Sequence, residues 1–272
     1  MHFADIKNDI AFRKIFGNDS KKEILISFLN AVLKLEGNHK IVWVEVVNPY
    51  QVPIVLGAKS TILDVKAKDE RGNEYIVEMQ LTDKLGFAKR VVYYSAKSYS
   101  AQLSVGEDYH TLKPTIFIGI VNFEFLATPH YLSRHLILDS ATHEHKLKDL
   151  EFNFIELPKF TKTESELTNL TDKWVYFIKN ASSLSDIPAN IDDAGLKAAF
   201  GEAERHRWTK ADVEAYEYAF LRESDDRAEK LLAVQKRSIE IAKKLINRNL
   251  TNEEIAEDTG LNPEQIEQLR RE

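Results

Sequence analysis

The segment spanning residues 61–81 constrains the fold of this chain more than any other part of its sequence. It reads as two strands of alternating polarity joined by a three-residue loop, 70–72. In a hairpin loop of this length, Gly72 takes the position that requires a positive φ. If Asp69 and Asn73 close the loop, the pairing of every residue in the two strands is fixed.

This register places two carboxylates, Asp64 and Glu78, directly opposite each other. Opposed side chains have Cβ atoms about 4.5–5.5 Å apart, and like charges so placed are destabilising. Such a pair indicates a cation between the two groups, because Mg²⁺ is usually held by one or two carboxylates. Two ordinary acids on a solvated face are the alternative, since a shift of one residue would separate them. The opposite face is apolar and is expected to enter the core: Leu63, Val65, Ala67, Tyr75, Val77, Met79 and Leu81.

Composition narrows the classes of protein that this chain can belong to. Its 272 residues carry a net charge of −6, so a surface for nucleic acid has to be a local basic patch. The chain has no cysteine, which excludes disulfides and thiol catalysis and favours a cytoplasmic location. Membrane insertion is not expected, because the most apolar run, 115–127, is short and contains Asn122 and Glu124.

The order of the predicted elements indicates an α/β layer with a mixed sheet. We expect a core over 1–181, a connector and long helical region over 182–250, and a small helical pair over 251–272. Residues 210–247 form either one long helix or two. The elements expected before them are helices at 6–16, 21–34, 86–105 and 164–181, and strands at 40–47, 61–69, 73–81, 115–125, 133–139 and 152–157, the strand from Thr115 being buried on both faces.

Several fragments, in this order, resemble the recombination-promoting nuclease and transposase family of the PD-(D/E)XK superfamily. They are DIKNDIAFRKIFGN (5–18), ILISFLNAVL (24–33), LDVKAKDERGNEYIVEMQ (63–80), KRVVYYSAKSYSAQL (89–103), the segment 109–120 and FIELPKF (154–160). The resemblance covers roughly residues 5–180 and implies a mixed central sheet flanked by helices. It also implies phosphodiester hydrolysis that depends on a divalent metal.

The resemblance assigns roles to particular positions. Asp64 and Glu78 look like the metal-binding acids, and Gln80 occupies the place of the motif lysine without its positive charge. Lys66, two residues from Asp64, is a candidate for a displaced ammonium group. Asp9, on the first helix, resembles an auxiliary acidic position, although a plain surface carboxylate is the slightly favoured reading.

The helix after the hairpin carries the candidates for contact with the DNA backbone: Lys89, Arg90, Tyr94 and Lys97. Contacts to phosphate position a duplex without reading its sequence, so recognition is expected to be weakly specific and sensitive to salt. The alternative is that the aromatic residues simply pack in the core and the basic residues are solvated.

The C-terminal helices are candidates for self-association. Residues 210–248 pass from acidic to basic, which favours an antiparallel partner such as a second copy of the chain. Residues 251–272 have the outline of a helix-turn-helix, but a small pair for association or capping is at least as favoured. Its second helix is acid-rich, with Glu264 and Glu267.

Together these features predict a DNA endonuclease that uses Mg²⁺, or else Mn²⁺ or Ca²⁺, at Asp64, Glu78 and Gln80, linked to recombination or mobile elements. The alternative is a catalytically weak or inactive nuclease fold that binds DNA or a partner. The neutral side chain of Gln80 and the acidity of the chain motivate this second hypothesis.

Overall fold

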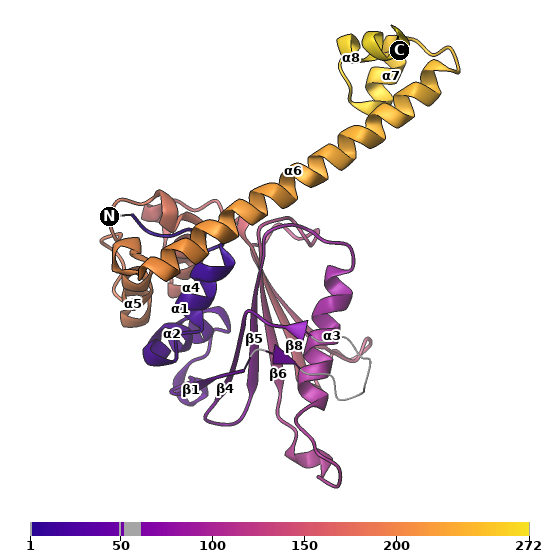
Figure 1. Cartoon of the computed structure of the whole chain (residues 1–272). Helices are drawn as coiled ribbons and strands as arrows, with labels where there is room; N and C mark the ends of the chain where they lie inside the picture. Colours follow the sequence, from indigo (N-terminus) through magenta and orange to yellow (C-terminus); the bar gives the residue numbers. More distant parts are fainter. Residues whose placement is uncertain (1, 49, 52–60, 272) are drawn as a thin grey trace. The chain divides into compact units, whose positions relative to one another are not determined.

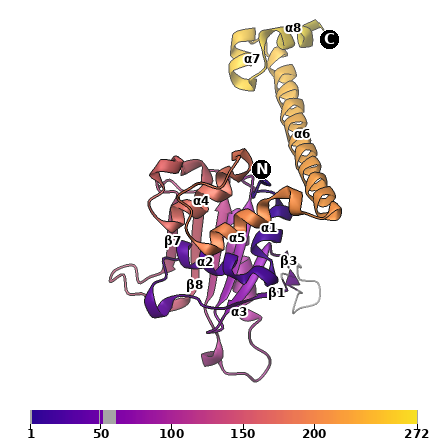
Figure 2. The ribbon, with the colours of Figure 1, turned by 90° about the vertical axis from the view of Figure 1, so that its left-hand side faces the viewer.

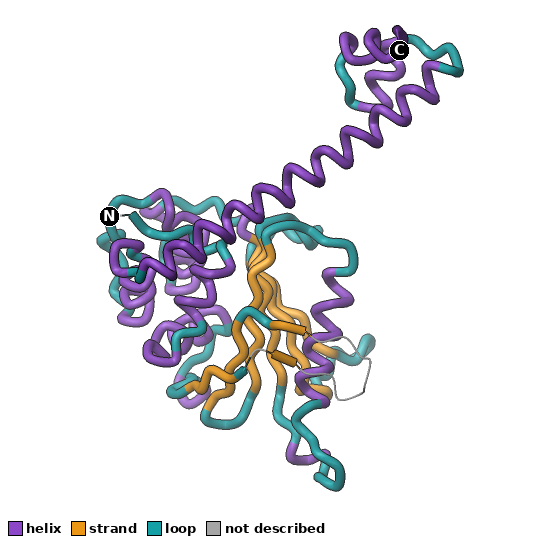
Figure 3. The backbone as a smooth tube through the Cα atoms, viewed as in Figure 1, coloured by secondary structure: helices purple, strands orange, loops and turns teal. Residues whose placement is uncertain are grey.

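The structure is a computed structural model that describes residues 2–48, 50–51 and 61–271 (Figures 1 and 3). The chain forms two compact units, Met1–Tyr216 and Glu217–Glu272. The first unit therefore contains the expected core, residues 1–181, together with residues 182–216. The two units are described separately.

A six-stranded mixed sheet forms the centre of the first unit, in the order β1-β4-β5-β6-β8-β7. The neighbours β5, β6 and β8 run parallel, whereas β1, β4 and β7 are each antiparallel to the strand beside them. A separate pair of short strands, β2 and β3, precedes β4. The bounds are β1 Val44–Val47, β2 Tyr50–Gln51, β3 Thr61–Ile62, β4 Val65–Asp69, β5 Glu74–Gln80, β6 Thr115–Val121, β7 Leu132–Ile137 and β8 Leu147–Glu156.

Helices cover both faces of this sheet, as expected for an α/β protein (Figures 1 and 2). One face packs against α1 (Asp9–Phe16), α2 (Lys22–Val32), α4 (Leu170–Asn180) and α5 (Ala194–Ala203), and the other against α3 (Phe87–Ser100). All seven residues of β6 are buried, which confirms the prediction for that strand. Short 3-10 helices lie at Asp19–Lys21, Gly37–His39, Tyr109–Thr111, Leu157–Lys159, Glu164–Glu166, Ala181–Ser183 and Arg205–Arg207.

Capping side chains set the helix boundaries that periodicity alone misplaces. The first helix begins at Asp9 and not at residue 6, because the side chain of Asn8 accepts hydrogen bonds from the N–H groups of Ile10 and Ala11. The helix expected from residue 164 begins at Leu170. There Asn169 caps its first turn through the N–H of Asp172.

The hairpin has the predicted register. The N–H of Asp69 donates to the carbonyl of Asn73 at 3.1 Å, and Gly72 has a φ of 84°. Val65 pairs with Val77, and the pairing continues to the turn.

The prediction that Leu63 lies on the same face of the sheet as Val65 is wrong. The chain bends at Asp64, between β3 and β4, and this bend interrupts the alternation of faces. Leu63 is buried in the cluster beneath α3, with Ile76 and Phe87, whereas Val65 faces α1 and α2.

The second unit is helical. It begins within α6 (Lys210–Ile246), which is a single helix, and its end carries α7 (Asn252–Thr259) and α8 (Pro263–Arg271). The side chains of Ala242, Ile255, Leu261 and Ile266 pack these three helices together. None of the helices in the described ranges has the length and apolarity needed to cross a bilayer.

Candidate active site

The bend at Asp64 brings its backbone and its carboxylate to the end of β5. The N–H of Asp64 donates to Oε1 of Glu78 at 3.1 Å. Oδ2 of Asp64 accepts the N–H of Met79 at 2.9 Å, beyond the last residue pair of the β4–β5 ladder. The Asp64 side chain is 9% exposed. Asp64 at the bend and Glu78 of β5 are thus held together by hydrogen bonds from backbone N–H groups.

The charge of this acidic pair is not fully compensated. Burial, and then the charge of Asp64, raise the pKa of Glu78 well above its ordinary value. The hydrogen bond from the Asp64 N–H and the charges of Arg90 and Arg13 act in the opposite direction without cancelling this rise. The same acids contribute to a raised pKa for the half-buried Tyr94, although burial is its largest cause.

Arg13 of α1 is the nearest cationic side chain on one side of the pair. Its Nη2 and Nε donate to Oδ1 of Asp64 at 2.8 and 3.2 Å. Partial burial lowers the pKa of Arg13, but the hydrogen bond and charge of Asp64 outweigh burial and raise it. The charge of Asp9, one turn earlier in α1, contributes to the same rise. Asp9 itself is exposed.

Arg90 of α3 approaches the site from the other face of the sheet. Its Nη2 donates to Oε1 of Gln80, and its guanidinium carbon lies 5.6 Å from the ring centre of Phe87. The Gln80 amide nitrogen in turn donates to the carbonyl of Thr82 at 3.0 Å. Arg90, expected from the sequence to contact DNA, is therefore hydrogen-bonded to the residue in the place of the motif lysine.

The structure does not bring Lys66 to the acidic pair. Its Nζ lies 3.0 Å from Oε2 of Glu74, a carboxylate that also contacts Lys68 and accepts the hydroxyl of Ser98. The buried Glu74 thus holds the ammonium group that the sequence suggested as a substitute.

The remaining candidates lie along α3. Lys89 is exposed, and Nζ of Lys97 lies 6.0 Å from the ring centre of Tyr93. Lys89 is exposed and Lys97 is partly exposed on the helix whose Arg90 reaches the site.

Sequence reasoning missed the contact made by Arg13. In the sequence, Arg13 lies one turn after Asp9 in the fragment that resembles the family, and this position could have indicated it. Only the packing of α1 against the sheet shows which acid Arg13 contacts. Reasoning also missed Glu156, at the end of β8. Its Oε2 accepts the N–H of Phe125 at 2.6 Å and lies 2.8 Å from Nζ of Lys159, which fixes the loop after β6.

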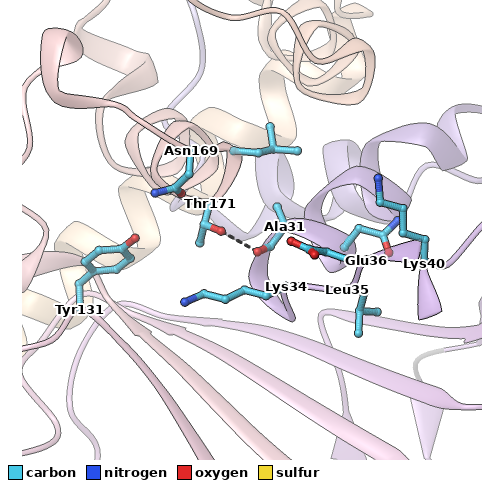
Figure 4. Close-up of a pocket in the computed structure, with 10 residues that line it drawn as sticks. Ala31, Lys34, Leu35, Glu36, Lys40, Tyr131, Asn169 and Thr171 are labelled. Carbon is cyan, nitrogen blue, oxygen red and sulfur yellow. Dashed lines mark hydrogen bonds between the residues drawn. The ribbon is translucent and has the colours of Figure 1, made fainter. Parts of the chain in front are cut away.

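A pocket of about 450 Å³ lies away from these residues, between the end of α2 and the start of α4 (Figure 4). Its polar groups serve the fold: the hydroxyl of Thr171 donates to the carbonyl of Ala31 at 2.6 Å, and Asn30 is paired with the backbone of Ile41. None of the predicted catalytic residues lines this pocket. Its lining residues are Asn30, Ala31, Lys34, Leu35, Glu36, Lys40, Tyr131, Asn169, Leu170 and Thr171.

The donor set at Asp64 and Glu78 suits a hard divalent cation. Carboxylate oxygens are the protein ligands that Mg²⁺ prefers, and the raised pKa of Glu78 marks negative charge that a cation would compensate. Across the described ranges, no group of three or more His, Asp or Glu side chains could hold a metal ion. A metal here would therefore be held by two acids, with water or substrate as further ligands.

A mixed sheet covered on both faces by helices, with a helical C-terminal region, is the α/β fold of PD-(D/E)XK nucleases. The chain belongs to the PD-(D/E)XK nuclease family of transposases, whose family model matches residues 6–233. This match confirms the resemblance found in the sequence. No curated protein and no solved structure matches the chain.

Proposed function

We propose that this protein is a divalent-metal-dependent DNA endonuclease that hydrolyses phosphodiester bonds with little sequence specificity. The observation that carries the proposal is the contact between Asp64 and Glu78. The two acids are held together although burial and the charge of Asp64 disfavour the ionised form of Glu78, as its raised pKa indicates. The transposase named in the family's description supports a role in recombination or mobile elements.

Each residue of the site has a distinct proposed role. Asp64 and Glu78 would hold Mg²⁺, or Mn²⁺ or Ca²⁺ in its place. A bound divalent cation would neutralise charge on the phosphate and lower the pKa of a bound water. Gln80 would orient the attacking water by hydrogen bonding, because an amide cannot serve as a general base near neutral pH.

Arg90 would supply the positive charge that Gln80 lacks. Its hydrogen bond to Oε1 of Gln80 keeps the guanidinium beside the acidic pair. DNA would then lie along α3, with Lys89 and Lys97 on its phosphates. This arrangement predicts binding that weakens steeply with salt.

The test is cleavage of supercoiled plasmid in Mg²⁺ or in EDTA by wild type, Asp64→Asn and Glu78→Gln. Glu151→Gln is the matched control, because Glu151 is a paired acid of the same sheet outside the site. Metal-dependent nicking lost only in the two site variants would support the proposal. Equal nicking by all four proteins, or none by wild type, would contradict it.

The contact of Arg13 with Oδ1 of Asp64 favours the alternative of a nuclease fold that only binds DNA or a partner, because Arg13 takes the place of a cation there. The uncharged side chain of Gln80 favours the same alternative. Binding of divalent ions, measured by calorimetry, separates the two hypotheses. An inactive fold would bind Mn²⁺ equally well with and without Asp64 and Glu78, while retaining its affinity for DNA.

A further inference from the structure

The middle of α6 carries an uncharged stripe along one side of the helix. Its members recur every three or four residues, the spacing that keeps side chains on one helical face. Four of them are large and exposed: Phe220 at 58%, Leu221 at 62%, Leu231 at 66% and Leu232 at 49%. The small or polar Ser224, Ala228 and Gln235 complete the stripe.

Apolar residues nearer the two ends of the same helix are packed against neighbouring elements. Before the stripe, Tyr216 is buried beside Trp208, and Val213 packs against the same cluster. After it, Ala242 is buried beneath α7 and α8, with Ile239 and Ile246 packed around it. A run of large apolar side chains left in water between two covered segments indicates a surface for a partner.

The charges of α6 identify the kind of partner. Residues 210–228 contain six acidic and three basic side chains, whereas residues 229–246 contain two acidic and five basic ones. A second copy running in the opposite direction would place each acidic half beside a basic half. A parallel copy would place like halves together, at a cost in repulsion.

We propose that two copies of this chain associate through the middle of α6 as an antiparallel helix pair centred near Ala228. This residue lies midway along the stripe and at the reversal of charge. Two-fold symmetry brings Ala228 of one copy close to Ala228 of the other, where a small side chain permits close approach. The bulky Leu232 of each copy then lies opposite the small Ser224 of the other. The pairing is independent of the proposed catalysis.

The first test is the mass of the full-length protein in solution, by size-exclusion chromatography with light scattering. We expect a dimer for wild type and a monomer for the double variant Leu221→Glu/Leu232→Glu. Val234→Glu is the matched control, because Val234 is 64% exposed on the same helix but lies off the stripe, and it should remain dimeric. A monomeric wild type, or dissociation by Val234→Glu alone, would overturn the proposal.

The second test gives the direction of the helices, and it uses the absence of cysteine from the chain. Under mild oxidation, Ala228→Cys should form a disulfide-linked homodimer. Gln235→Cys alone should not, whereas a mixture of Leu221→Cys and Gln235→Cys should cross-link as a heterodimer. Self-linkage of Gln235→Cys as efficient as that of Ala228→Cys would indicate a parallel pair and refute the antiparallel arrangement.

Discussion

The guanidinium of Arg13 lies on Asp64, with Nη2 2.8 Å from Oδ1. Oδ2 of the same carboxylate accepts the N–H of Met79, so both oxygens of Asp64 are hydrogen-bonded. A cation that binds Asp64 has to compete with Arg13 for Oδ1. α1 therefore contributes a positive charge that partly compensates the two acids.

Replacing Arg13 by Met should strengthen the binding of divalent ions. The Arg13 side chain is 44% exposed, so the lost ion pair is worth at most about 1 kcal/mol, which corresponds to roughly fivefold in Kd. Calorimetric titration with Mn²⁺ measures the change. Arg134→Met is the control, because Arg134 makes a comparable two-nitrogen contact with Glu151, at 2.8 Å for each nitrogen. Weaker or unchanged Mn²⁺ binding by Arg13→Met would show that Arg13 does not compete.

Arg90 and Gln80 should behave as one functional unit. Arg90→Met should slow cleavage by at least about tenfold, since the charge near the acids is lost, while Arg90→Lys should retain part of the rate. Adding Gln80→Lys to Arg90→Met should recover activity, because the lysine restores the charge at the motif position. Single-turnover rates at saturating Mg²⁺ provide the comparison. Failure of the double variant to exceed Arg90→Met would argue that Arg90 has another role.

The acidic pair should lower the stability of the metal-free protein. Because the pKa of Glu78 is raised above its ordinary 4.5, the folded state binds more protons than the unfolded state between that value and the raised pKa. Wild type therefore loses stability as pH rises, and Glu78→Gln does not. In EDTA at pH 8 the variant should be more stable by about 1 kcal/mol or more, a difference that vanishes near pH 4. Urea unfolding at both pH values measures it, and a variant less stable than wild type at pH 8 would refute the argument.

The sequence predicts the site where local chemistry determines the geometry. Gly72 and the alternation of the strands fix the hairpin register, and the register alone brings Asp64 towards Glu78. It does not predict the bend at Asp64, which turns Leu63 to the other face of the sheet. Local pairing rules assume a continuous ladder, and the bend interrupts that ladder.

The partners of the long basic side chains could not be predicted either. The packing of α1 on the sheet determines that Arg13 reaches Asp64. Lys66 reaches Glu74 diagonally across the hairpin, beside the directly opposed Lys68–Glu74 pair, and not the nearby acid Asp64. Charge type and spacing along the chain do not carry that information, because these side chains have many rotamers and several acids nearby.

Asp172, at the start of α4, should make the fold sensitive to acid. Burial tends to raise its pKa, but hydrogen bonds from Nζ of Lys162 at 2.7 Å and the hydroxyl of Tyr131 at 2.6 Å outweigh burial and lower it. A carboxylate with a lowered pKa contributes stability above its unfolded pKa and loses it as pH falls through the folded value. Asp172→Asn should therefore cost about 2 kcal/mol at pH 7, and this difference should shrink below about pH 4.

Denaturant unfolding across this pH range tests the role of Asp172. Asp192→Asn is the matched control, because Asp192 bonds to Lys173 of the same helix at 2.7 Å but its side chain is 85% exposed. Solvent screens an exposed ion pair, which therefore contributes little to stability, so the control should unfold nearly as wild type does. If the two variants lost equal stability, or if the loss in Asp172→Asn did not change with pH, burial of Asp172 would not be the cause. A selective loss would show that buried hydrogen bonds to this carboxylate fasten α4 to the loop before β7, at the wall of the pocket in Figure 4.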